Sequence, residues 1–144
     1  MDASAERSAW RRAAAIAVAI GALLPAAGSP AAEVKLEAIG SQEVPPVRTP
    51  ATARGAIEVG VDRSVSGSLT VVGFAPTEAH IHLGAPGTSG AVVIALFRNG
   101  DVLSVPSGAK LSEAQYAAFR AGNLYVDVHS PTHPQGEIRA QLRP

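Results

Sequence analysis

Short segments in which apolar and polar residues alternate run through most of this chain. The alternation is clearest over residues 34–39, 56–61, 66–72 and 124–129. Successive side chains of a β-strand point to opposite faces, so a period of two predicts strands with one buried face. Segments rich in proline or glycine, such as residues 41–52 and 84–90, separate the strands. This pattern predicts an all-β fold, an antiparallel Greek-key β-sandwich of about seven to eight strands.

Two segments depart from the alternation. Residues 91–97 form a continuous apolar run, which predicts a buried strand. Between Leu111 and Gly122, Ser112 can cap a helix and Gln115 can complete a capping box three residues later. Gly122 suits the left-handed end of a helix. We therefore expect one short helix near residues 112–121.

The first thirty residues differ from the rest in composition. Three arginines precede an apolar run over residues 13–24, and small residues follow at 26–29. This order predicts a signal peptide at residues 1–32, cleaved near 28 or 32, followed by a domain at 33–144. The run is short for a bilayer of ~30 Å, so an uncleaved anchor is the less favoured alternative. We expect a periplasmic or secreted protein that leaves the membrane after cleavage.

Composition excludes several kinds of site. The chain has no cysteine, and its single methionine is Met1. Disulfides, thiolate sites and thioether-rich Cu(I) sites are therefore excluded. A formal net charge of zero and few aromatic residues argue against nucleic acid as a partner. No protein partner is indicated.

All four histidines fall in two short clusters. His80 and His82 are two residues apart on a predicted strand, so their side chains share a face. His129 ends a later predicted strand, and His133 follows in a proline-bearing loop. If the two strands are neighbours, these histidines can surround one ion. We predict all four as metal ligands, with His133 depending on how its loop folds; the alternative is that they are structural.

The donor type ranks the metals. Imidazole nitrogens suit copper(II) and zinc, and copper(II) leads the divalent affinity order, so copper is expected and zinc is the alternative. Asp127 shares the face of His129 and is either an orienting group or a solvated residue. Glu137 and Arg139 share a face of the last predicted strand and are expected to form an ion pair. No nucleophile elbow is present, and a non-enzymatic role is favoured without excluding an enzyme.

Several ordered motifs resemble the chordin-type (CHRD) domain. They lie at residues 43–47, 79–84, 87 and 90, 124–129 and 134–139. The resemblance covers residues 33–142 and implies an extracytoplasmic β-sandwich. It says little about activity.

The chain is more distantly similar to copper/zinc superoxide dismutases. In that similarity His80 and His82 match a His-x-His strand and His129 a later copper ligand. The chain lacks that family's cysteine pair and its long zinc loop. Three functions are therefore weighed: copper storage, delivery or tolerance; a copper-only dismutase-like redox enzyme; and a non-metal extracytoplasmic binding module.

Overall fold

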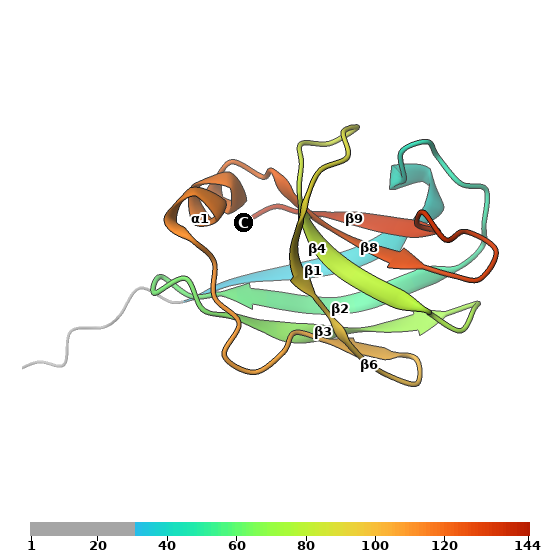
Figure 1. Ribbon diagram of the computed structural model, residues 1–144, viewed down its shortest axis with the longest axis horizontal. Coiled ribbons are helices and arrows are strands. Elements are labelled where there is room, and N and C mark those ends of the chain that lie inside the picture. Colours follow the sequence, from blue (N-terminus) through green and yellow to red (C-terminus); the bar gives the residue numbers. More distant parts are fainter. Residues whose placement is uncertain (1–30) are drawn as a thin grey trace, which may run out of the picture.

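The structure, a computed structural model, describes residues 31–144 and consists of nine antiparallel strands and one short helix (Figure 1). The predicted signal peptide lies almost wholly outside the described residues. The elements are β1 (Ala32–Ile39), the 3-10 turn η1 (Gly40–Gln42), β2 (Thr52–Val59), β3 (Val65–Val72), β4 (Glu78–Leu83), β5 (Val92–Ala95), β6 (Phe97–Asn99), β7 (Val102–Ser104), α1 (Glu113–Arg120), β8 (Leu124–His129) and β9 (Ile138–Leu142).

The strands form one continuous sheet in the order β5-β4-β8-β9-β1-β2-β3-β7-β6. Figure 1 shows the sheet curling, so that β4, β8 and β9 lie over β1, β2 and β3. The predicted all-β antiparallel fold is confirmed, with nine strands in place of seven to eight. The apolar run at 91–97 is split at Leu96, whose N–H donates to the Ala79 carbonyl at 2.9 Å. The strands on either side of Leu96, β5 and β6, therefore occupy opposite edges of the sheet, and the predicted buried strand is wrong, since Val92 is 53% and Phe97 65% exposed.

The inner face of the curled sheet carries the hydrophobic core. On β8, Leu124, Val126 and Val128 point inward and are almost fully buried. Full burial of such a side chain contributes about 1.5–3 kcal/mol. The alternate residues Tyr125 and Asp127 point outward yet are also buried, because the loops at 84–91 and 130–137 cover this part of the outer face. A covered outer face allows polar residues to gather away from both core and solvent.

The helix α1 forms where the capping pattern predicts it. Ser112 Oγ accepts a hydrogen bond from the Gln115 amide at 3.1 Å, and Gln115 Oε1 accepts one from the Ser112 amide at 2.8 Å. Gly122 follows with φ of 74°, the left-handed conformation that favours glycine. Phe119 is the buried residue that anchors the helix. Within residues 31–144, no helix has the length and apolar character needed to cross a membrane.

Candidate metal centre

The pairing of β4 with β8 brings the two histidine clusters together. In the antiparallel register His80 lies opposite Asp127, Glu78 opposite His129, and His82 opposite Tyr125. Residues directly opposite one another share a face, and so do residues two apart along a strand. His80, His82, Asp127 and His129 therefore all project from the outer face of the sheet.

These four side chains converge on one point. Each offers a ligand atom, and these atoms all lie within 4.8 Å of one another. The His80 ring stands perpendicular to both other imidazoles, with centroid distances of 5.4 Å to His82 and 5.1 Å to His129. The Asp127 carboxylate lies between the latter two, 3.0 Å from His82 Nε2 and 3.1 Å from His129 Nε2. His80 Nδ1 is 3.8 Å from the same carboxylate.

Backbone carbonyls fix the orientation of two of the imidazoles. His82 Nδ1 lies 2.9 Å from the Gly90 carbonyl, and His129 Nδ1 lies 2.8 Å from the Pro134 carbonyl. A carbonyl only accepts, so each Nδ1 carries a hydrogen and donates it. Nε2 is then the nitrogen that each ring presents to the centre. Such outer hydrogen bonds are a usual feature of metal-binding histidines.

The loop at 84–91 holds His82 from two sides. A Cβ at Gly90 would collide with the Leu83 carbonyl, so only glycine lets the loop approach this closely. The Gly90 amide donates to the Tyr125 hydroxyl at 3.1 Å. The Tyr125 ring stacks on His82 with a centroid distance of 4.8 Å and an interplanar angle of 3°. Rigid support of this kind positions a ligand before an ion arrives.

The charges of the centre are coupled. Burial works to raise the pKa of Asp127, but the adjacent imidazoles of His129 and His82 prevail and lower it to about 2. The nearby carboxylate of Asp127 raises the pKa of His129. For His82, burial opposes this effect, yet the bonds to Asp127 and Gly90 leave its pKa raised. Burial lowers the pKa of His80 and favours its neutral, ligand-competent form.

Two buried nitrogens of the centre make no hydrogen bond of acceptable geometry within the described part of the chain: His80 Nδ1, and His129 Nε2, which lies close to the Asp127 carboxylate but is not aligned with it. A buried polar atom left unpaired costs about 1–3 kcal/mol, so such atoms call for an explanation. A cation placed among them would satisfy both. Three imidazole nitrogens and one carboxylate are a suitable donor set for copper(II) or zinc. The residues present therefore fit a metal ion.

The fourth histidine lies in a different cluster. His133 Nδ1 is 3.2 Å from Glu137 Oε2, and its side chain is 38% exposed. Glu137 also accepts hydrogen bonds from Thr49 Oγ1 at 2.7 Å and from the Ser130 hydroxyl. These bonds outweigh the effect of burial and lower the pKa of Glu137. The structure thus groups three of the four predicted ligands with Asp127 and places His133 with Glu137.

The predicted ion pair between Glu137 and Arg139 does not form. Arg139, only 1% exposed, donates instead to the carbonyls of Thr88 at 2.7 Å and Ala85 at 3.1 Å. Its guanidinium lies 3.5 Å from the centre of the Tyr125 ring. The strand β9 begins at Ile138, so Glu137 lies in the preceding loop, and the loop at 84–91 folds over Arg139 and takes its donors.

Asp127 is the member of the centre that the sequence left ambiguous. It is 5% exposed and lies among the imidazoles, so the solvated alternative was wrong. The sequence signal for Asp127 was its position two residues before His129, which puts both side chains on the same face of the strand. Only the pairing with β4 shows that two more histidines flank it.

Comparison with known protein families matches the CHRD domain over residues 34–142. The match covers most of the chain, which therefore belongs to the CHRD domain family. No curated protein and no solved structure matched in the corresponding comparisons.

Proposed function

We propose that this chain is an exported copper-binding protein that serves in copper storage, delivery or tolerance. The observation that carries the proposal is the convergence of three imidazoles around Asp127 with two buried nitrogens unpaired. His80 binds through Nδ1, and His82 and His129 bind through Nε2. Asp127 supplies the anionic donor.

Copper(II) is proposed ahead of zinc because it binds nitrogen donors more tightly. A divalent ion would also take the place of positive charge that the histidines carry when no ion is bound. Imidazolium forms of His82 and His129 neutralise Asp127 when no ion is bound. Binding of a divalent ion displaces up to two of these protons, so the net charge of the centre changes little.

A role in copper handling is supported by an exposed carboxylate, that of Glu78, which lies beside the buried histidines. Glu78 is 59% exposed, and its carboxylate lies 3.6 Å from both His80 Nε2 and His129 Nδ1. An exposed carboxylate beside buried ligands attracts cations from solvent. The same access suits a dismutase-like redox enzyme, which is the second candidate.

The test is a copper(II) titration of the purified, metal-free protein, followed by spin resonance and metal analysis. We expect one ion per chain, with hyperfine splitting from coordinated nitrogen. Copper should dissociate as the pH falls from about 8 to 4.5, because imidazole must be neutral to bind. Absence of uptake at stoichiometric copper, together with an unchanged melting temperature, would refute both metal functions and favour a binding module with structural histidines. Superoxide decay on the loaded protein then separates storage or delivery from redox catalysis.

Export is tested separately. Cells that express the full chain should hold the protein outside the cytoplasm, and mass spectrometry should show cleavage near residue 28 or 32. A matched chain without residues 13–24 should stay in the cytoplasm. If both chains are recovered at full length from the same fraction, the leader prediction is wrong.

A further inference from the structure

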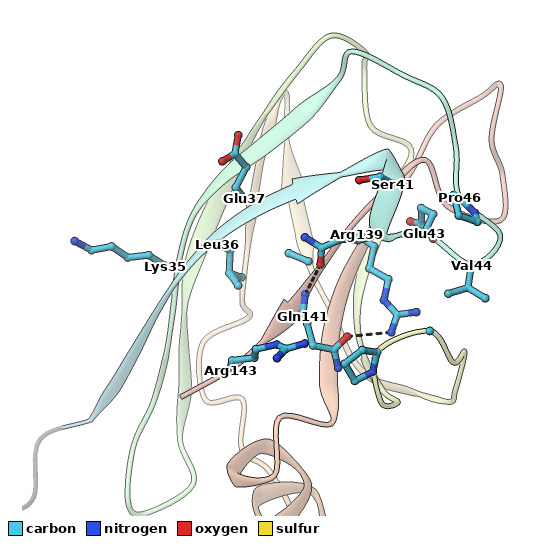
Figure 2. A pocket seen from close by; sticks show the side chains of 14 residues that line it. Lys35, Leu36, Glu37, Ser41, Glu43, Val44, Pro46, Arg139, Gln141 and Arg143 are labelled. Carbon is cyan, nitrogen blue, oxygen red and sulfur yellow. Dashed lines mark hydrogen bonds between the residues drawn. The ribbon is translucent and has the colours of Figure 1, made fainter.

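Arg139 carries a buried positive charge beside the candidate metal centre. It is 1% exposed, and within residues 31–144 no carboxylate lies within 4.0 Å of its guanidinium. Its donors meet neutral oxygens: the carbonyls of Ala85 and Thr88, and Oε1 of Gln141 at 3.0 Å. Figure 2 shows the last of these bonds as a dashed line. The charge is thus held inside the fold, where charges interact more strongly than in water.

A stack of three side chains joins this charge to the centre. The guanidinium lies 3.5 Å from the middle of the Tyr125 ring, and His82 stacks on the same ring with a centroid distance of 4.8 Å. At these distances both groups cannot share one face of the ring, so Arg139 and His82 lie on opposite faces of Tyr125. Arg139 is also directly opposite Asp127 in the register of β8 and β9. It therefore projects from the same outer face of the sheet as the proposed ligands.

Glu43 compensates the charge of Arg139 only in part. Burial and the charge of Asp127 raise the pKa of Glu43 to about 7, and they prevail over Arg139, which acts to lower it. This carboxyl is therefore incompletely ionised near neutral pH. Asp127 is itself surrounded by imidazoles, and it becomes a donor to the ion once a metal binds. A bound ion would thus lie in the positive field of Arg139.

The oxidation state of a bound copper ion decides how strongly this field acts on it. The ionised Asp127 contributes one negative charge to the centre, and neutral imidazoles contribute none. Cu(II) therefore leaves the centre with one positive charge, whereas Cu(I) leaves it neutral. Repulsion from the guanidinium acts on the first state and hardly on the second.

We infer that Arg139 sets the oxidation-state preference of the copper centre, because its buried charge disfavours Cu(II) relative to Cu(I). The inference rests on the proposed copper function and adds to it a residue that is not a ligand. One electron from an external donor reduces Cu(II) to Cu(I), and the positive charge that the centre loses is the one that Arg139 repels. Removal of the charge of Arg139 should therefore favour Cu(II) and lower the reduction potential.

Competition titrations measure the affinity for Cu(II) in air and for Cu(I) without oxygen, and an electrode measures the potential of the loaded protein. Arg139→Gln should raise the affinity for Cu(II) about tenfold and leave that for Cu(I) unchanged, which lowers the potential by about 59 mV. The control is Arg143→Gln. Arg143 is exposed, so solvent and salt screen its charge, and both affinities should stay within about twofold of the parent.

A second variant tests the same charge and leaves Arg139 in place. Gln141→Glu puts a carboxylate where Oε1 of Gln141 now meets the guanidinium, so it should also raise the affinity for Cu(II), by at least about threefold. The variant loses the bonds from Gln141 Nε2 to the carbonyls of Gly84 and Gly122, and denaturant unfolding measures that cost separately. If Arg139→Gln does not fold, Gln141→Glu decides the question.

A structural role of Arg139 predicts a different result. If Arg139 only holds the loop at 84–91, Arg139→Gln weakens the binding of Cu(II) and Cu(I) together, because His82 loses its support. That result overturns the inference, and so does a difference in potential that disappears between about 0.05 and 0.5 M salt, since a buried charge is screened little. If the parent binds no copper, the proposed function falls with the inference. If the parent binds copper and both variants keep its ratio of affinities within about twofold, the inference alone is wrong.

Discussion

Two clusters on neighbouring parts of the outer face pair an imidazole with a buried carboxylate, and they differ in how the carboxylate is satisfied. We call the cluster of His80, His82, Asp127 and His129 the Asp127 cluster, and that of Thr49, Ser130, His133 and Glu137 the Glu137 cluster. Glu137 accepts from two hydroxyls as well as from His133. Within residues 31–144, the ion-pair partners of Asp127 within 4.0 Å are the imidazoles of His80, His82 and His129.

This difference separates a candidate metal site from a structural clamp. Hydroxyl donors satisfy Glu137 without any ion, and His133 Nδ1 is already engaged with Glu137 and with Thr132 Oγ1. In the Asp127 cluster two buried nitrogens stay unpaired. Proximity of histidine to carboxylate is thus a weak signal for a metal, and unpaired donors are the stronger one.

The two clusters are also mechanically connected. Glu137 and Ser130 hold the loop at 130–137, and the Pro134 carbonyl of that loop accepts from His129 Nδ1. The Glu137 cluster therefore orients a ligand of the Asp127 cluster. Four of the predictions below change a residue of one cluster and measure copper binding at the Asp127 cluster, and one changes Glu43, whose pKa responds to Asp127.

The largest effect is expected for His82→Ala. Loss of one of three imidazoles, together with its stacking on Tyr125, should weaken copper binding at least about 100-fold, or ~2.7 kcal/mol. His80→Ala should behave in the same way. Competition with a chelator of known affinity measures this. Affinity within threefold of the parent protein for both variants would show that the Asp127 cluster is not the site.

In the parent protein, ionisation of Glu43 should lower the free energy of unfolding by about 2–3 kcal/mol as the pH rises, and Glu43→Gln should remove this loss. The pKa of Glu43 is about 7 in the fold against 4.5 ordinarily, mainly because of burial and of Asp127. The folded state then binds more protons than the unfolded chain between these values, so stability falls as the pH rises through this window. The variant should be more stable than the parent near pH 8 and equal near pH 4. Denaturant unfolding of both proteins in the presence of a chelator, repeated between pH 4 and pH 8, measures this effect. If the free energy of unfolding depends on pH in the same way in both proteins, the prediction is wrong.

Asp127→Asn should weaken copper binding about 10–100-fold, because the amide supplies neither the anionic donor nor the charge that balances the ion. The metal-free variant should bind fewer protons at neutral pH, since the carboxylate raises the pKa of His129 and His82. NMR titration of the histidine ring protons measures that shift. Unchanged histidine pKa values would mean that Asp127 does not couple the cluster.

Glu137→Gln should lower the free energy of unfolding by about 1–2 kcal/mol. The carboxylate accepts hydrogen bonds from two hydroxyls, and in the amide one of the accepting oxygens is replaced by an NH₂ group that cannot accept. The freed loop should also weaken copper binding by a few-fold through His129. Chemical denaturation and the copper titration measure the two effects. Loss of stability with full copper affinity would show that the clusters are not connected.

The smallest effect is expected for His133→Ala. Its ring is partly exposed and engages Glu137 from outside the Asp127 cluster, so copper affinity should change less than about threefold and stability less than about 1 kcal/mol. If His133→Ala weakens copper binding as much as His82→Ala does, His133 is a ligand after all. Comparison of the two variants in one titration series is therefore the most direct test of the contrast between the clusters.

Local patterns predicted what depends on local geometry. The alternation along residues 124–129 assigned Tyr125, Asp127 and His129 to one face, and Ser112 with Gln115 located the helix. The break at Leu96 was not predicted, because an apolar run does not show that closure of the sheet sends the strands before and after it, β5 and β6, to opposite edges.

The sequence by itself therefore determined the strand character of the chain, the strand face on which His80, His82 and His129 lie, and the absence of sulfur ligands. Tertiary structure decided the composition of the site. Asp127 joins His82 across 45 positions of sequence through the pairing of β4 with β8, and two loop carbonyls select the nitrogen that each of two rings presents. The physical reason is that side-chain direction follows from a period of two within one strand, whereas register between strands and the path of a loop depend on contacts summed over the whole fold.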